Sequence, residues 1–87
     1  MQTLDLSYND ISDISDQDVF LPPLNLTNLH LSNNHLSHVP LDKILSLPNL
    51  KVLNLEENEI GVFDERFMKI IQNGTVFKYS GNNRFNN

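Results

Sequence analysis

The chain has 87 residues, of which 39% are hydrophobic and 20% charged, with a formal net charge of -5 at pH 7. This composition is typical of one small globular domain, and no apolar run is long enough to insert into a membrane. The acidic balance excludes nucleic acid as a partner, and the absence of cysteine excludes disulfides, thiolate metal sites and thiol nucleophiles.

Eleven-residue segments with the pattern L-x-x-L-x-L-x-x-N-x-L recur along the chain. They begin at Met1, Leu26 and Leu50, so successive starts are 25 and then 24 residues apart. A fourth copy begins at Gly74, but Gly74 itself and Arg84 break its pattern. We expect a single domain, 1–87, with repeats at about 1–25, 26–49 and 50–73 and a degenerate repeat at 74–87.

Each repeat begins with a predicted short strand. Apolar residues at the fourth and sixth positions alternate with polar neighbours, as a half-buried strand requires. These inward residues are Leu4 and Leu6, Leu29 and Leu31, Leu53 and Leu55, and Phe77 and Tyr79.

An asparagine follows each strand, where the chain turns and backbone groups lose their partners. An inward amide side chain supplies both a donor and an acceptor there, which predicts a stacked structural ladder. Its members are Asn9, Asn34, Asn58 and Asn82.

The segments that link the strands differ from one repeat to the next. In the first, Pro22 and Pro23 oppose a helix and favour an extended return. Residues 41–47 and 64–73 are each predicted to form a short helix. Apolar residues of these segments complete the core, namely Ile11, Ile14, Val19, Phe20, Leu36, Val39, Ile44, Leu45, Leu47, Ile60, Phe63, Phe67, Ile70 and Ile71.

Over essentially its whole length the sequence resembles the leucine-rich repeat family. The resemblance implies an α/β fold: a horseshoe-like segment of a right-handed solenoid, with a parallel sheet of short strands on the concave face and loops or short helices on the convex face. Tyr79–Asn82 is similar to the approach to the C-terminal cap of animal extracellular members, whose G-N-P-W-x-C motif is replaced at Asn83, Arg84 and Asn86. We therefore expect a fragment that self-associates end to end through uncapped repeats or is marginally stable.

The outward strand positions are where this family usually places ligand contacts. Tyr8 and His30 are the best anchors, because an aromatic side chain buries area while it keeps a hydrogen bond. The alternative is a merely solvated face. The expected contact residues are Asp5, Ser7, Tyr8, Asn28, His30, Ser32, Asn33, Asn54, Glu56, Glu57 and Lys78.

A further row follows the asparagines and contains Asp10, His35, Glu59 and Asn83. If the register holds, His35 lies between two carboxylates, which raise its pKa. This is either a pH-sensitive contact or an ordinary surface charge pattern. A metal site is not expected, because the spacing of His30, His35 and His38 matches no familiar ligand motif.

Two N-x-T triplets, at Asn25 and Asn73, are candidate glycosylation sites in the loops that enter the strands. With thirteen asparagines in the chain, such triplets also arise by chance. If they are used, the protein is extracellular or on the cell surface.

The sequence favours a non-enzymatic module that recognises a protein or glycan, as part of an extracellular receptor, adhesion or innate-immunity protein. The alternative is an intracellular scaffold or regulator of another protein. Catalysis and cofactors are not expected, because the sequence contains no combination of nucleophile, base and orienting group and no glycine-rich phosphate loop.

Overall fold

The computed structural model describes residues 2–12, 22–61, 63 and 65–82. The predictions for Ile14, Val19, Phe20 and the cap-like residues from Asn83 onward lie outside these ranges. The described elements, in chain order, are β1 (Thr3–Asp5), β2 (Asn28–His30), α1 (Leu41–Leu45), β3 (Val52–Asn54), α2 (Glu65–Gln72) and β4 (Val76–Lys78).

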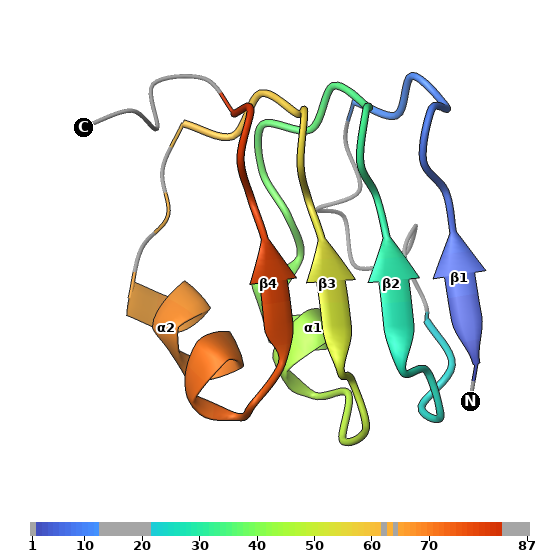
Figure 1. Ribbon diagram of the computed structural model, residues 1–87, viewed down its shortest axis with the longest axis vertical. Coiled ribbons are helices and arrows are strands. Elements are labelled where there is room, and N and C mark those ends of the chain that lie inside the picture. Colours follow the sequence, from blue (N-terminus) through green and yellow to red (C-terminus); the bar gives the residue numbers. More distant parts are fainter. Residues whose placement is uncertain (1, 13–21, 62, 64, 83–87) are drawn as a thin grey trace.

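The strands form one parallel sheet in the order β1-β2-β3-β4 (Figure 1). Leu29 lies opposite Leu4 on one side and Leu53 on the other, and Leu53 lies opposite Phe77. Equivalent positions of successive repeats are therefore direct neighbours, so the register expected from the eleven-residue pattern is confirmed. The backbone hydrogen bonds between neighbouring repeats continue past the strand ends, where Leu31 N–H donates to Asn54 O at 2.8 Å.

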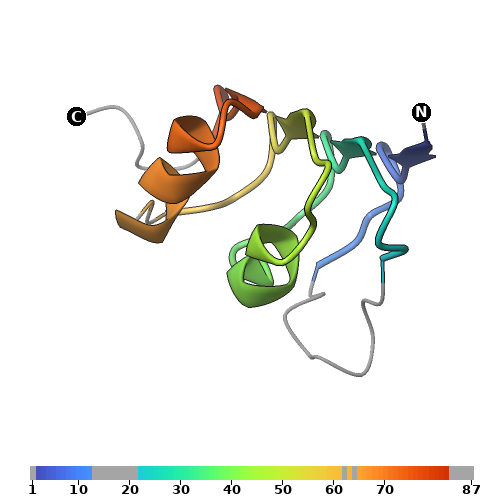
Figure 2. The same ribbon diagram turned by 90° about the horizontal axis from the view of Figure 1, so that it is seen from below.

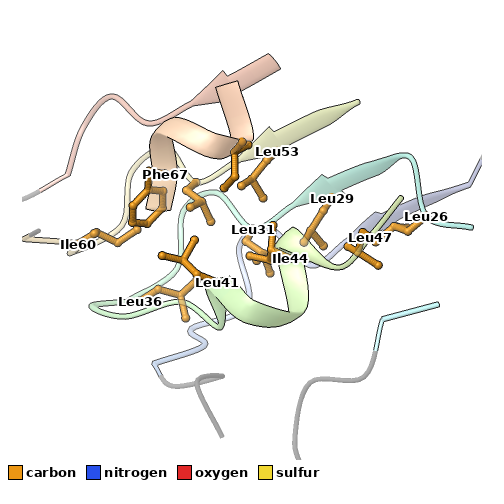
Figure 3. Packing of buried hydrophobic residues seen from close by; sticks show 12 residues of the cluster. Leu26, Leu29, Leu31, Leu36, Leu41, Ile44, Leu47, Leu53, Ile60 and Phe67 are labelled. Carbon is orange, nitrogen blue, oxygen red and sulfur yellow. The ribbon is translucent and has the colours of Figure 1, made fainter. Parts of the chain in front are cut away.

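Both helices lie on the same side of the sheet (Figure 2). The inward leucines of the strands meet the helices there and form the core (Figure 3). Leu29, Leu31, Leu53 and Leu55 have no exposed surface, as expected for the two central repeats. Among the described residues, neither helix has the length and apolarity needed to cross a membrane.

Helix α1 is a short segment whose buried side chains are Leu41 and Ile44, three positions apart on one face. It follows Pro40 and ends at Leu45, and the hydroxyl of the next residue, Ser46, donates to Lys43 O at 2.7 Å. The predicted helix at residues 41–47 is thus confirmed for Leu41–Leu45, while Ser46 and Leu47 lie outside it.

Helix α2 buries Phe67 and Ile70 against the core. It ends where Gly74 adopts φ +86° and its N–H donates to Ile71 O, a left-handed termination that glycine allows at low cost. The prediction that Ile71 belongs to the core was wrong. Its side chain is 46% exposed, whereas Phe67 and Ile70 are the residues that α2 buries.

The two ends of the sheet are less well covered than its centre. In the first repeat Leu4 and Leu6 are only half-buried, and in the last Tyr79 is 38% exposed. Phe67 stacks on Phe77 with ring centroids 5.4 Å apart, and Phe77 lies 5.1 Å from Tyr79. The inward residues of the first and last repeats are therefore less buried than those of the two central repeats.

Candidate functional site

The turn after each strand is organised by asparagine amides that connect neighbouring repeats. Asn34 Oδ1 accepts hydrogen bonds from the backbone N–H groups of Asn9 (2.9 Å) and Ile11 (3.0 Å). Its Nδ2 donates to Leu6 O at 3.0 Å and to Leu31 O at 3.1 Å. One buried side chain therefore satisfies backbone groups of its own repeat and of the repeat before it.

The same arrangement recurs at the next two repeats. Asn58 Oδ1 accepts from Leu36 N–H at 3.0 Å, and its Nδ2 donates to Leu31 O at 2.9 Å. Asn82 Oδ1 accepts from Ile60 N–H at 3.0 Å. These bonds connect the turns that follow successive strands, where six of the predicted contact residues lie, namely Ser7, Tyr8, Ser32, Asn33, Glu56 and Glu57.

Asn9 departs from this pattern. It is exposed, and its Nδ2 donates to Ser7 O within its own turn at 3.1 Å. Because β1 is the edge of the described sheet, no described repeat lies on its outer side to receive a cross-repeat bond. Only three of the four expected ladder residues therefore link repeats in the described part of the chain.

The residue before each ladder asparagine adopts a left-handed backbone conformation. The φ angles are +60° at Tyr8, +58° at Asn33 and Glu57, and +76° at Gly81. Sequence reasoning missed this feature, although Gly81 and Asn33 are the residue types that adopt it most readily. The conformation occurs three residues after the end of each strand, where the chain turns.

The eleven predicted contact residues lie in the four strands or two to three residues after them, and none is buried, whereas the leucines that alternate with them pack into the core. We call these residues the strand face. Paired register brings Asp5, His30, Asn54 and Lys78 into one row across it. Tyr8 is 76% exposed, the largest exposed fraction among the large hydrophobic residues that the structure describes. The strand face is thus a continuous, mainly polar surface.

Hydrogen bonds within the strand face hold several of its polar side chains. The Ser7 hydroxyl and N–H both donate to Asp5 Oδ1, and they lower the pKa of that carboxyl below its ordinary 3.8. Asn54 Oδ1 accepts from Glu56 N–H in the same way, at 3.0 Å. The Ser80 hydroxyl donates to Glu56 Oε2 at 2.8 Å. These side chains are therefore positioned before any partner arrives.

His35 lies between carboxylates of both neighbouring repeats. Its Nδ1 is 2.9 Å from Glu59 Oε2, and its Nε2 is 3.3 Å from Asp10 Oδ1. The hydrogen bond to Glu59 is the main cause that raises the pKa of His35 above its ordinary 6.5, and Asp10 adds to it. The expected row of Asp10, His35 and Glu59 is confirmed, while Asn83 lies outside the described residues.

A comparison with protein-family models matches residues 25–70, more than half of the chain, to the description "Leucine rich repeat". The chain belongs to the leucine-rich repeat family. A second model with the same description matches residues 1–15. Searches of curated proteins and of solved structures found no match. The family consists generally of non-enzymatic binding modules, so these repeats point to protein interaction.

The three histidines of this leucine-rich repeat chain lie in different surroundings. His30 lies in β2, His35 is held by the two carboxylates, and His38 Nδ1 is 3.1 Å from the Ser37 hydroxyl. Within the described ranges, no group of three or more His, Cys, Asp or Glu side chains could hold a metal ion.

The two candidate glycosylation triplets of the leucine-rich repeat chain occupy equivalent turns. Asn25 and Asn73 are both exposed. The Thr27 hydroxyl donates to Gln2 O at 3.0 Å, and the Thr75 hydroxyl donates to Leu50 O at 2.9 Å. Each threonine therefore links adjacent repeats, which gives it a structural role whether or not the asparagine carries a glycan.

Proposed function

We propose that this chain is a recognition module of an extracellular receptor, adhesion or innate-immunity protein, which binds a protein or glycan through the strand face. In this proposal the strand face is the concave side of a right-handed coil, and the helices form the convex side. Family membership supports a binding role. The observation that carries the choice of surface is that none of the predicted contact residues is buried, whereas the other side of the sheet is occupied by the core.

Tyr8 and His30 are the proposed anchors. Tyr8 offers an exposed ring with a hydroxyl, and His30 lies near the centre of the strand face in β2. Glu56 and Glu57 give one end of the strand face a negative charge, and Lys78 is its basic residue. A protein partner with lysine or arginine opposite these glutamates fits this distribution, and its association would weaken as salt screens the charges.

The test is a partner capture from an extracellular extract with immobilised chain. The variant Tyr8→Ala/His30→Ala is compared with Lys69→Ala/Gln72→Ala, which removes two exposed side chains from α2 on the other side of the molecule. We expect the first variant to lose about tenfold or more in affinity for a captured protein and the second to retain it. Equal binding by both variants would mean that the binding site is not on the strand face.

An extracellular location is proposed from the exposed asparagines of both triplets. Both lie at the turns that lead into strands, so glycans there would leave the strand face accessible. Expression in a secretory eukaryotic host followed by peptide mass spectrometry should show glycan on Asn25, Asn73 or both. Secreted protein without glycan at either position would remove this support and favour the intracellular scaffold.

A further inference from the structure

A groove of about 370 Å³ lies between the two helices, beside the starts of β3 and β4. The residues that line it include Leu45 of α1, Pro48 in the chain that follows α1, and Asn73 at the end of α2. Asn73 is also one of the two candidate glycosylation sites. We propose that the groove holds the first sugar of a glycan on Asn73, an inference that rests on the proposed extracellular location.

The groove belongs to the middle of the described repeats. Both helices lie on the same side of the sheet (Figure 2), and the residues that line the groove come from the second and third repeats and the start of the fourth. Ile44 and Ile70, each 2% exposed, connect it to the core. Pro48 is exposed, and Leu45 and Leu50 are half-buried. A bound group would therefore meet apolar side chains on its inner side and water on its outer side.

The backbone holds the attachment residue in place beside the groove. Asn73 N–H donates to Lys69 O at 3.0 Å, and Gly74 N–H donates to Ile71 O at 2.9 Å. The next residue, Thr75, is 8% exposed, and its hydroxyl donates to Leu50 O at 2.9 Å. A sugar on an attachment point that is already fixed loses less freedom when it settles against the protein.

The chemistry of N-acetylglucosamine suits this position. Its C–H groups and acetyl methyl can pack on Leu45 and Pro48, while its hydroxyls remain in water. Glycosylation joins Asn73 Nδ2 to C1 of this sugar, which a lipid-linked diphosphate oligosaccharide supplies. The C1–O bond to the diphosphate breaks as the N–C1 bond forms, and Nδ2 gives up one proton.

Asn25 provides the matched control within the same chain. It is exposed, it precedes a strand in the same way, and it does not line this groove. Its neighbour Leu24 is 69% exposed. We therefore expect a sugar on Asn73 to stabilise the fold and a sugar on Asn25 to leave the stability almost unchanged.

The test uses two variants of the 87-residue chain that each keep one site, Asn25→Gln and Asn73→Gln. Each is made in a secretory eukaryotic host and trimmed by an endoglycosidase to a single N-acetylglucosamine, and each is also made in bacteria without sugar. The sugar on Asn73 should raise the melting temperature by about 4 °C or more, and the sugar on Asn25 by less than about 1 °C. Mass spectrometry confirms which asparagine is modified.

A change in the groove tests the contact itself. Pro48→Ser should reduce the gain from the sugar on Asn73 by about half, whereas Pro23→Ser, at an exposed proline outside the groove, should leave that gain unchanged. Equal melting of the Asn73-modified and unmodified chains would overturn this inference but not the extracellular location. So would a glycan found on Asn25 alone. Absence of glycan from both asparagines would overturn the inference and the support for that location together.

Discussion

At the scale of single residues, Asn34, Asn58 and Asn82 each bind backbone groups of neighbouring repeats. Asn58 is 4% exposed, and its amide donates to Leu31 O and Leu55 O and accepts from Leu36 N–H. Alanine would leave buried backbone groups without partners. We predict that Asn58→Ala lowers the free energy of unfolding by about 2 to 4 kcal/mol.

The matched control is Asn9→Ala, because Asn9 is exposed and bonds within its own turn. We expect it to cost about 1 kcal/mol or less. Urea unfolding of both variants measures the difference. Equal losses would mean that the cross-repeat bonds contribute nothing beyond the local turn.

The left-handed residues before the asparagines yield a stabilising prediction. Glu57 has φ +58°, a conformation that costs an L-residue with a side chain about 1 to 2 kcal/mol. Glu57→Gly should therefore raise the free energy of unfolding by up to about 1 kcal/mol, after the loss of backbone entropy is subtracted. Gly81→Ala is the opposite change, because Gly81 has φ +76° and a Cβ there would collide with the Glu57 carboxylate. Thermal melts should rise for the first variant and fall for the second.

The paired carboxylates around His35 predict a pH dependence. Its pKa is raised in the folded chain, so the protonated imidazole stabilises the fold below the ordinary pKa of 6.5. That stabilisation is lost as pH rises through the raised value. His35→Gln should be less stable than the parent chain at acidic pH and equal to it at alkaline pH. Unfolding measured across this range, together with NMR titration of His35, checks the prediction, and a pH-independent difference would contradict it.

At the scale of elements, α2 shows how the position of an apolar side chain on a helix decides how much it contributes to the free energy of unfolding. Ile70 is 2% exposed in the core, whereas its neighbour Ile71 is 46% exposed. Ile70→Ala should lower the free energy of unfolding by about 2 to 4 kcal/mol, and Ile71→Ala by about 1 kcal/mol or less. Chemical denaturation, at a concentration low enough to keep the chain monomeric, measures the loss of unfolding free energy in each variant. A larger loss for Ile71 would mean that α2 is rotated from its described orientation.

Much of this architecture could be predicted because the repeat pattern fixes both strand position and register. The inward leucines and the two short helices follow from apolar spacing. Ile71 could not be placed in this way, because helical spacing puts it on the same face as Phe67. Its exposure depends on whether another segment covers that side of α2. The strained φ of Glu57 and Tyr8 was equally hidden, since these residue types rarely adopt it.

At the scale of the whole molecule, the repeat pattern limits what can be predicted about the strand face. Inward positions are constrained by packing, and their residue types therefore report the fold. Outward positions such as Tyr8, His30 and Glu56 face solvent, so the fold accepts many residue types there. The location of the candidate site could be predicted from the sequence, but the chemistry of the partner could not. The bonds of Asp5 with Ser7 and of Glu56 with Ser80 required coordinates.

The central claim is that successive repeats lie parallel and one repeat apart in register, sharing one interior. Scalar couplings across hydrogen bonds in NMR spectra test it most directly, because they identify donor and acceptor residues. The account predicts couplings from Leu6 N to the His30 carbonyl, from Leu31 N to that of Asn54, and from Leu55 N to that of Lys78. Couplings that connect these strands in antiparallel order, or in a register shifted from these pairs, would contradict it.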